Sequence, residues 1–383
     1  MSSKGTATII ISGGGTGGHY YPAMAIAEAI QRLSGTMLKD IRVDCHYVGS
    51  AFGIERRLAP GSGLKYTLLP VKGFSRYFSV RAFLQNLLLP FRLIKAWLIT
   101  LVLYRQKDPV ATVVSGGYAA AVPGYISGRR HIPLFVQEQN AFPGVTSRML
   151  SKHAMAFFYA YDEVKAHIRH DVLFIKSGNP VRSNIISMDK YEARKRFGLD
   201  TALFTLLIFG GSQGSLSINT YIAKRIESWI YKYEIQVLWQ TGEASYPMLK
   251  RDFAEHNHIH LLKYIDDMAA AYSAADMVIS RAGALSLAEI QKMRLPAILV
   301  PLPGAAGNHQ YHNAKALESR ECAFVVEEKD FPENPFTPHL NDMINDPEKL
   351  PVMRDNFPKD RENAAEKIAA SVINHLRAFY AWS

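Results

Sequence analysis

Cysteine is scarce in this chain of 383 residues. Cys45 and Cys322 are the two that it contains, and two are too few for the disulfide framework on which small secreted domains depend. The first six residues, Met1 to Thr6, also lack the apolar stretch and the cleavage site of a secretory signal peptide. We therefore expect a cytoplasmic protein in a reducing compartment.

Long apolar runs are missing as well, because charged residues and prolines interrupt every stretch that approaches the roughly 20 residues of a transmembrane helix. Acidic residues are absent between Lys72 and Lys107, although the chain's net charge of +10 suits nucleic acid, anionic lipid or phosphorylated substrates. The basic residues of this segment are Lys72, Arg76, Arg81, Arg92, Lys95, Arg105 and Lys107. They alternate with large apolar residues, which predicts a surface that binds an anionic membrane rather than nucleic acid. The alternative is an ordinary pair of core helices, in which the Lys and Arg side chains extend along the apolar surface and keep their charged ends in water.

Short β-rich runs alternate with helical patterns along the whole chain, which is typical of parallel sheets built from βαβ units. The candidate strands are Thr8–Ser12, Val43–Val48, Val110–Ser115, Leu134–Gln137, Phe204–Phe209, Ile235–Trp239, His260–Leu262, Met277–Ser280 and Ala297–Val300. Two of them run into glycine-rich turns about 190 residues apart, and this repetition predicts two doubly wound α/β domains facing each other across a ligand-binding cleft. We expect the domains to span residues 1–178 and 179–360, with a closing helix in 361–383 that packs back on the first domain.

The first glycine-rich turn, Gly13 to Gly18, has the spacing G-x-G-x-x-G. Glycines allow close approach of the backbone to a ligand, and the start of the following helix attracts anionic or oxygen-rich groups. A dinucleotide is disfavoured because the next strand ends Tyr47-Val48-Gly49-Ser50, without a carboxylate for the ribose. His19 follows the turn, where the helix dipole favours a neutral imidazole. It could act as a general base or only contact a ligand.

The second turn, Gly210 to Ser215, is not a Walker A loop because no lysine follows the glycines. Its amides, together with Ser212 and Gln213, could hold a diphosphate at the start of a helix from about Leu216, or the turn could be purely structural. Further on, Ser286-x-x-Glu289 predicts a capping box. Glu289 could alternatively bind the hydroxyls of a ribose from the first helical turn.

A metal centre is not predicted by His309 and His312, because no Asp, Glu or Cys lies close to them in the sequence. Polar contacts with a sugar fit this pair better.

Several short motifs occur in an order that resembles one family over residues 8 to about 330. They are Gly14-Gly15-Thr16-Gly17-Gly18-His19-x-x-Pro22-Ala23, Gly116-Gly117-Tyr118, Glu138-Gln139-Asn140, Gly178-Asn179-Pro180-Val181-Arg182, Gly210-Gly211-Ser212-Gln213-Gly214, Asp266-Asp267-Met268, Ser280-Arg281-Ala282-Gly283 and His309-Gln310-x-x-Asn313-Ala314. Together they resemble the MurG family of GT-B glycosyltransferases. These enzymes add N-acetylglucosamine from its UDP donor to undecaprenyl-diphospho-muramoyl-pentapeptide in peptidoglycan synthesis.

The resemblance implies roles for individual residues. Ile265 matches a backbone contact to uracil, Glu289 a ribose ligand, and Ser212 and Arg182 contacts to the diphosphate. The donor sugar would be lined by Ala284, Leu285, Gln310 and Asn140, and we include the intervening Ser286, Leu287 and Ala288 in the same substrate-binding set. Thr16, Gly17 and Gly18 match a loop that closes over both substrates, and His19 matches the proposed base.

Three positions depart from the family pattern. Gln137 stands where a histidine is common, Ala119 to Ala121 replace a stretch with a serine and a glycine, and Asn308 replaces an aspartate. The first two changes lie on the acceptor side, so they affect the expected fine positioning of the acceptor rather than the donor.

The reaction implied by the resemblance is attack of the 4-hydroxyl of the muramoyl sugar on the anomeric carbon of UDP-N-acetylglucosamine, with inversion and without cofactor or metal. The protein would lie peripherally on the cytoplasmic face of the bacterial plasma membrane, with cell-wall synthesis or division proteins as candidate partners. The alternatives are a transferase that uses another lipid such as diacylglycerol, a UDP-sugar epimerase, and a catalytically silent UDP-sugar-binding protein.

Overall fold

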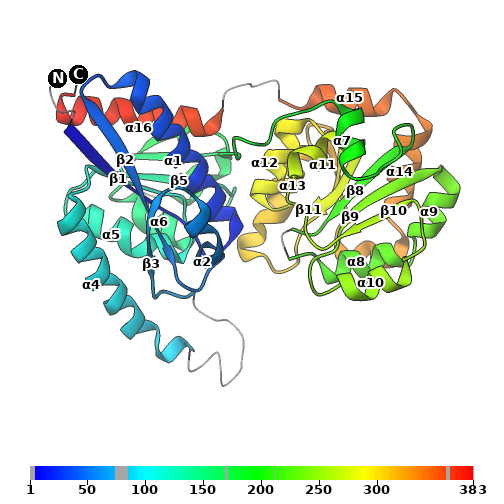
Figure 1. Cartoon of the computed structure of the whole chain (residues 1–383), viewed down its shortest axis with the longest axis horizontal. Coiled ribbons are helices and arrows are strands. Elements are labelled where there is room, and N and C mark those ends of the chain that lie inside the picture. Colours follow the sequence, from blue (N-terminus) through cyan, green and yellow to red (C-terminus); the bar gives the residue numbers. More distant parts are fainter. Residues whose placement is uncertain (1–4, 74–84, 169–170, 212, 359–362, 383) are drawn as a thin grey trace. The chain divides into compact units, whose positions relative to one another are not determined.

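The computed structural model describes residues 5–73, 85–168, 171–211, 213–358 and 363–382 (Figure 1). The chain divides into two compact units. Unit 1 comprises residues 1–182 together with 361–383, and unit 2 comprises residues 183–360. Each unit is described by itself below.

Unit 1 is built on a parallel sheet of seven strands in the order β3-β2-β1-β4-β5-β6-β7. The strands are β1 (Gly5–Ser12), β2 (Ile41–Ser50), β3 (Lys65–Leu69), β4 (Ala111–Val114), β5 (Leu134–Glu138), β6 (Ala156–Tyr159) and β7 (Leu173–Lys176). The helices are α1 (Gly17–Met37), α2 (Glu55–Leu58), α4 (Leu89–Lys107), α5 (Ala121–Arg129), α6 (Val145–Ser151) and α16 (Ala364–Tyr380).

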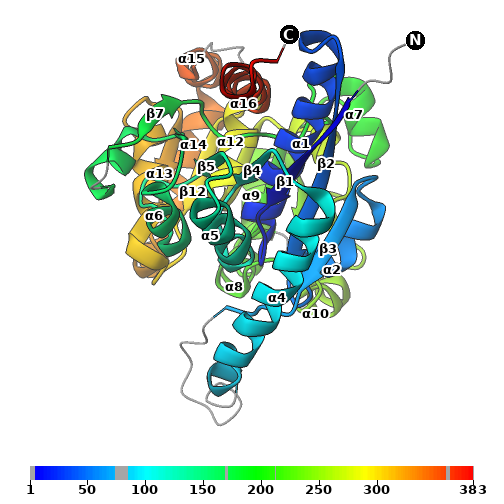
Figure 2. The ribbon, with the colours of Figure 1, turned by 90° about the vertical axis from the view of Figure 1, so that its left-hand side faces the viewer.

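Successive residues of β1 are buried against different helices, as expected for a central strand covered on both faces. Ile9 and Ile11 pack with α1 and α16, whereas Ile10 packs with α4 and α5. In Figure 1 the C-terminal helix α16 runs alongside α1, and Figure 2 shows α4 and α5 on the other face of the sheet. The last helix of the chain therefore contributes Ile368, Val372 and Leu376 to the core of the N-terminal unit.

Unit 2 repeats this architecture with six parallel strands in the order β10-β9-β8-β11-β12-β13. The strands are β8 (Phe204–Phe209), β9 (Ile235–Gln240), β10 (Ile259–Leu262), β11 (Met277–Arg281), β12 (Ala297–Val300) and β13 (Ala323–Val325). The helices are α7 (Lys190–Arg196), α8 (Leu216–Ala223), α9 (Ile226–Tyr233), α10 (Tyr246–Asp252), α11 (Met268–Ala274), α12 (Ala284–Met293), α13 (His309–Glu318), α14 (Phe336–Asn345) and α15 (Lys349–Asn356).

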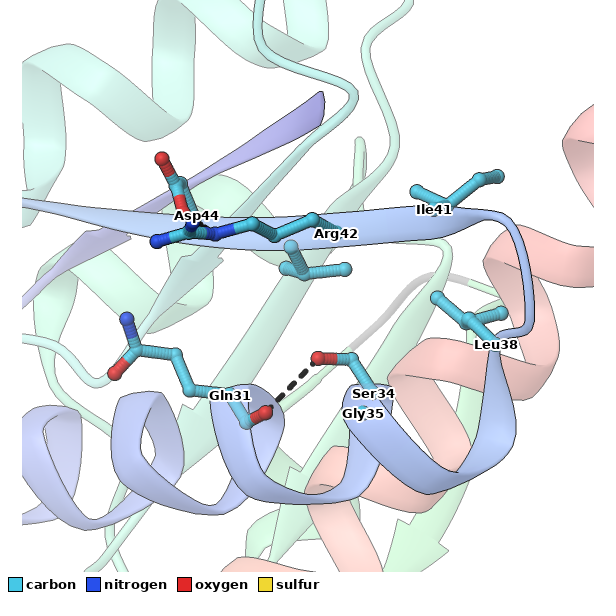
Figure 3. Close-up of a pocket in the computed structure, with 8 residues that line it drawn as sticks. Gln31, Ser34, Gly35, Leu38, Ile41, Arg42 and Asp44 are labelled. Carbon is cyan, nitrogen blue, oxygen red and sulfur yellow. Dashed lines mark hydrogen bonds and ion pairs between the residues drawn. The ribbon is translucent and has the colours of Figure 1, made fainter. Parts of the chain in front are cut away.

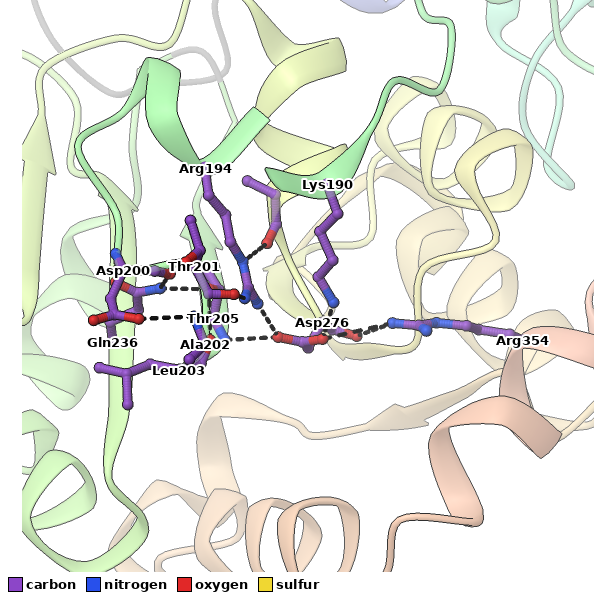
Figure 4. A network of polar contacts seen from close by, with 11 residues as sticks. Lys190, Arg194, Asp200, Thr201, Ala202, Leu203, Thr205, Gln236, Asp276 and Arg354 are labelled. Atoms are coloured by element: carbon purple, nitrogen blue, oxygen red, sulfur yellow. Dashed lines mark hydrogen bonds and ion pairs between the residues drawn. The ribbon is translucent and has the colours of Figure 1, made fainter. Parts of the chain in front are cut away.

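A cluster of ionic contacts ties two helices of unit 2 to its sheet (Figure 4). Asp276, directly before β11, lies 2.7 Å from the Arg194 guanidinium and forms an ion pair with Lys190, and both cations belong to α7. Arg354 of α15 is 3.8 Å from the same carboxylate. Because Asp276 precedes the strand, this cluster stabilises the edge of the sheet opposite to the turn after β8.

The predicted α/β class with two doubly wound sheets is confirmed. Sequence analysis missed β3, β6, β7 and β13, which have three to five residues each. The boundary expected at residue 178 falls four residues before the division between the units. Among the described residues no helix is long and apolar enough to cross a membrane.

Candidate active site

His19 lies at the point where the strand order of unit 1 reverses. β1 is flanked by β2 on one side and β4 on the other, and α1 begins at Gly17 immediately after the turn that follows β1. Ligands of doubly wound sheets bind at this position, beyond the carboxyl ends of the strands. His19 is the third residue of α1, at the N-terminus of the helix as expected, and the helix includes Pro22.

The imidazole of His19 is held by the segment that follows β4. Its Nδ1 lies 2.9 Å from the backbone carbonyl oxygen of Ser115, and the Ser115 hydroxyl donates to the backbone carbonyl of His19 at 2.6 Å. Gly116 and Gly117 have φ values of 88° and 76°, and a Cβ on either would come within about 3 Å of the ring. Glycine is required here both for the left-handed backbone and for this close contact.

The contact with Ser115 determines which nitrogen of His19 carries the proton. A carbonyl oxygen can only accept a hydrogen bond, so Nδ1 must donate. In the neutral ring Nε2 then has a lone pair, and none of the hydrogen bonds among the described residues uses it. The ring is therefore arranged to accept a proton at Nε2.

The glycines of the first turn make room for the protein's own side chains. A Cβ on Gly13 would collide with Ser115, one on Gly14 with Glu55, and one on Gly15 with Tyr118. The Gly15 amide already donates to the Glu55 carboxylate at 2.9 Å, and Glu55 is completely buried. The amide of this part of the turn is therefore already hydrogen-bonded to a carboxylate of the protein itself.

The rest of the first turn is accessible. Thr16 and Gly18 are exposed and Gly17 is half-buried, at the start of α1. These three residues and His19 are consecutive in the chain, and each is at least partly exposed in unit 1.

Two more predicted residues of unit 1 lie near these elements. Asn140 follows β5, and both its backbone and side-chain N–H groups donate to Glu138, at 3.0 and 3.1 Å. The guanidinium of Arg182 lies over the ring of Tyr21 in α1, 4.8 Å from its centroid. Arg182 therefore contacts the N-terminal part of α1 through Tyr21.

The second glycine-rich turn occupies the equivalent position in unit 2, since β8 lies between β9 and β11. Helix α8 begins at Leu216 as predicted, and the Ser215 hydroxyl caps it by accepting from the Ile218 amide at 3.4 Å. Gly214 has a φ of 77°, and a Cβ there would lie 2.1 Å from the carbonyl oxygen of Thr241. By contrast, Gly211 has a φ of 91° with open space around it. Ser212 lies outside the described residues.

A buried arginine stabilises this second glycine-rich turn. Arg281, at the end of β11 and 8% exposed, donates to the hydroxyls of Ser215 and Ser217 at 2.8 Å each and forms an ion pair with Glu328. It also donates to the backbone carbonyl of Pro301 at 3.2 Å. The cation therefore joins the start of α8 to β11, to the end of β12 and to the segment after β13.

The capping box predicted at Ser286 and Glu289 is wrong. Helix α12 begins at Ala284 with Gly283 as its N-cap, and the Leu287 amide donates to the Gly283 carbonyl at 2.9 Å. Ser286 is consequently the third helical residue, and Glu289 lies in the second turn. The Glu289 carboxylate is 4% exposed and accepts a hydrogen bond from the Tyr272 hydroxyl at 3.0 Å.

The other predicted residues of unit 2 differ in accessibility. Ala284, Leu285, Ser286 and Ala288 are partly exposed on α12, whereas Leu287 is fully buried and belongs to the core. The Ile265 amide, after β10, already donates to the Gln240 side chain at 2.8 Å. The Gln310 side chain of α13 accepts from the Leu302 amide at 3.0 Å.

Two cavities of unit 1 lie at the opposite edge of its sheet. One of about 350 Å³ lies between the last turns of α1 and the first residues of β2, and is lined by Gln31, Leu38 and Asp44 among others (Figure 3). The other, about 680 Å³, adjoins the start of β5 and contains Lys152 and His153. Both adjoin the amino ends of strands, so neither includes His19.

Sequence reasoning missed the residues that hold these side chains in place. These supporting residues are distant in sequence from the groups they contact. They are Ser115, Glu55 and Gln139 around the first turn, and Gln240 and Glu328 around the second. Two of them left a signal in the sequence. Gln139 lies in the motif Glu138-Gln139-Asn140, and Glu55 is a carboxylate five residues beyond the strand end where a ribose ligand was sought.

Comparison with known proteins identifies the family of this chain. The description "Glycosyltransferase family 28 N-terminal domain" matches residues 9–159, and "Glycosyltransferase family 28 C-terminal domain" matches residues 205–372. A relative from Chlorobium limicola is 35% identical over 90% of this chain and 92% of its own length. It is named UDP-N-acetylglucosamine–N-acetylmuramyl-(pentapeptide) pyrophosphoryl-undecaprenol N-acetylglucosamine transferase. The chain belongs to this transferase family.

The fold is shared more widely than the family. The crystal structure of MurG from Acinetobacter baumannii superposes with a TM-score of 0.66 at 23% identity, covering 98% of this chain and 99% of its own. A UDP-N-acetylglucosamine 2-epimerase superposes with a TM-score of 0.64 at 11% identity, covering 99% of this chain and 97% of its own. The family membership confirms the resemblance noted in the sequence, while the epimerase illustrates that the fold does not by itself determine the activity.

Proposed function

We propose that this chain transfers N-acetylglucosamine from UDP-N-acetylglucosamine to the 4-hydroxyl of undecaprenyl-diphospho-N-acetylmuramoyl-pentapeptide, with inversion. The family membership supports the substrates. The observation that carries the mechanism is the protonation of His19, whose Nδ1 donates to the Ser115 carbonyl and leaves Nε2 as the acceptor. Nε2 takes the proton of the attacking hydroxyl.

The departing UDP acquires negative charge, and we assign its stabilisation to the turn of unit 2. Open space at Gly211, the capped start of α8 and the absence of acidic residues in the first turn of that helix all favour a diphosphate. Arg182 and Ser212 are the proposed additional diphosphate contacts, Glu289 the ribose ligand, and Ile265 the uracil contact through its backbone. Asn140, Gln310 and the start of α12 would line the sugar, and Thr16 to Gly18 would close over the substrates.

These groups supply cationic and amide stabilisation of the leaving group, so the proposed chemistry runs without a metal ion. The test is transfer of labelled N-acetylglucosamine to a short-chain analogue of the lipid acceptor in detergent, with EDTA present. We expect a disaccharide-lipid product, and we expect His19→Ala to lower kcat at least a hundredfold, the low end for loss of a general base, while UDP affinity stays nearly unchanged. Tight UDP binding without product would direct the search to another lipid acceptor such as diacylglycerol.

We also propose that unit 1 binds the cytoplasmic face of the membrane through the segment 72–107. Residues 74–84, including Arg76 and Arg81, lie outside the described residues. The described part supports the proposal, because α4 packs into the core with Ala96, Thr100 and Tyr104 yet exposes apolar side chains on its other side. The exposed residues, each 53–68% accessible, are Leu87, Phe91, Ile94, Leu98 and Val102. Their spacing of three or four residues forms one apolar stripe, which begins at Leu87 just before α4 and continues along the helix.

The stripe can be tested with vesicles of phosphatidylglycerol. The double variant Ile94→Asp/Leu98→Asp should bind them at least tenfold more weakly, since each apolar side chain is worth about 1.5–3 kcal/mol when buried. Met248→Asp/Val352→Asp, which changes two exposed apolar residues on helices of unit 2, is the matched control. Equal vesicle binding by both double variants would exclude the stripe as the membrane contact.

A further inference from the structure

We propose that Gln139, Gln137 and Asn179 form a neutral amide relay that keeps the proton of His19 on Nδ1 and so maintains Nε2 as the base. The inference rests on the proposed function, in which Nε2 accepts the proton of the acceptor hydroxyl. Gln139 and Gln137 are positioning residues, because they act through His19 rather than on the substrates.

The first link is the side chain of Gln139, which is 1% exposed. Its Nε2 donates to the Ser115 carbonyl at 2.7 Å and to Oε1 of Gln137 at 2.5 Å. A primary amide has two N–H groups, so both are used. The remaining atom, Oε1, lies 3.1 Å from Nδ1 of His19.

The orientation of this amide follows from its neighbours. If the amide were reversed, its oxygen would face two other oxygens, those of Ser115 and Gln137, and its NH₂ group would face the Nδ1–H of His19. All three contacts would then be repulsive, and each would leave a buried polar group without its hydrogen bond. The environment therefore selects the orientation in which Gln139 presents an acceptor to His19.

The second link orients Gln137, which is fully buried at the end of β5. Its Nε2 donates to Oδ1 of Asn179 at 3.4 Å, and Nδ2 of Asn179 donates to the backbone carbonyl of Gln139 at 3.0 Å. The contacts thus close a ring from Gln139 through Gln137 and Asn179 back to Gln139. Amides connected in this way polarise one another, which strengthens the acceptor that faces His19.

The consequence for the chemistry is specific. Within the described part of the chain, two acceptors and no donor contact Nδ1, so the proton stays there in both the neutral and the protonated ring. When Nε2 takes the substrate proton, the same two acceptors stabilise the imidazolium. Because the relay carries no net charge, it fixes the tautomer without the strong attraction for a proton that a carboxylate would exert.

The tautomer can be measured without substrate by ¹⁵N NMR of the histidine side chains in the full-length protein at pH 8. The His19 signals are assigned by their loss in His19→Gln. We expect a protonated Nδ1 and an unprotonated Nε2. Gln137→Met removes one of the two hydrogen bonds that orient Gln139 and leaves the Ser115 carbonyl as the fixed acceptor for Nδ1, so we expect the fraction of the tautomer protonated at Nε2 to increase. A protonated Nε2 in the unaltered protein would overturn the relay, whether or not the chain transfers the sugar.

The second measurement is the pH profile of kcat. Gln139→Glu places a carboxylate beside Nδ1, so the acidic limb should move upward by about one to two pH units. Gln137→Met should lower kcat about tenfold or more with little change in the KM for UDP-N-acetylglucosamine, since a misoriented base weakens catalysis rather than binding. A merely structural role of the glutamines would lower stability and leave the acidic limb in place, which would refute the relay.

Gln236→Glu is the matched control. Gln236 is likewise 1% exposed and donates from its side chain twice, to the Asp200 carbonyl at 2.7 Å and to the Thr205 hydroxyl at 2.8 Å, but it lies in β9 of unit 2. We expect the Gln236→Glu variant to be less stable than the unaltered protein and to keep the same pH profile of kcat. If the tautomer is as proposed but no acceptor is glycosylated, the proposed function fails and the relay stands.

Discussion

Replacement of Arg281 by methionine tests how the second glycine-rich turn is held. The guanidinium connects Ser215 and Ser217 at the start of α8 with Glu328 and with the carbonyl of Pro301. Methionine fills much of the volume but provides no donor. The variant would leave the Glu328 carboxylate, whose side chain is only 23% exposed, without its cation.

The expected loss follows from this burial. Breaking one partner of a buried ion pair costs about 3–5 kcal/mol, because the remaining charge is left desolvated. Glu328→Gln keeps an oxygen that can accept from Arg281, so it should cost less, about 1–2 kcal/mol. Arg294→Met removes a surface pair with Asp355, where the two side chains are 39% and 75% exposed, and should cost about 1 kcal/mol or less.

Urea unfolding monitored by tryptophan fluorescence gives the free energy of unfolding of all three variants, since Trp229 and Trp239 are both buried in unit 2. Calorimetric titration with UDP gives the functional effect, and we expect Arg281→Met to weaken UDP binding about tenfold because the start of α8 is no longer fixed. If Arg281→Met were as stable as Arg294→Met, the ion pair would contribute nothing measurable and the assignment of Arg281 as the support of the turn would be wrong.

Three further predictions concern stability. Gly214→Ala should destabilise the protein by more than about 3 kcal/mol, and Gly211→Ala by only about 1–2 kcal/mol. Both glycines have a positive φ, but only at Gly214 would a Cβ lie against a backbone carbonyl. Equal urea midpoints for the two variants would contradict this prediction. Glu55→Gln should cost about 1–3 kcal/mol, since an NH₂ group would then face the Gly15 amide, and an unchanged melting temperature would show that the carboxylate is not needed. Burial, with Lys107 and Lys65 nearby, lowers the pKa of His46 from its usual 6.5 to about 4. Between these two pH values the protein takes up a proton when it unfolds, so its stability should fall as the pH decreases from 6.5 to 4. His46→Gln should remove this component, so parallel curves of melting temperature against pH for the two proteins would be inconsistent with a lowered pKa.

The strands that were predicted from sequence patterns are those with continuous apolar runs. One example is Phe204–Phe209, which begins and ends at the same residues in the structure as in the prediction. The missed strands are short or lie at sheet edges. Leu173–Lys176 is the last strand of its sheet and has exposed residues at both ends, so it carries neither a buried run nor a clear alternation. Ala156–Tyr159 is fully buried, but four residues give too short a pattern to recognise.

The site was predictable where the signal is local. Glycine spacing located both turns, and the position after a strand located His19. The capping box failed because a second local signal, Gly283 in an extended conformation, starts the helix three residues earlier. The supports of the site could not be found in this way, since Ser115 lies 96 residues from His19 and Glu328 lies 47 residues from Arg281.

The two glycine-rich turns resemble each other in sequence but differ in what the folded chain places against them. In unit 1 a fully buried carboxylate, Glu55, accepts from the Gly15 amide, so negative charge already lies beneath the turn and opposes a second anion. In unit 2 the space at Gly211 is open, and no acidic residue lies in the first turn of α8. Electrostatics therefore supports the proposed placement of the proton acceptor at the first turn and of the departing diphosphate at the second. This division of roles depends on residues that neither glycine motif contains.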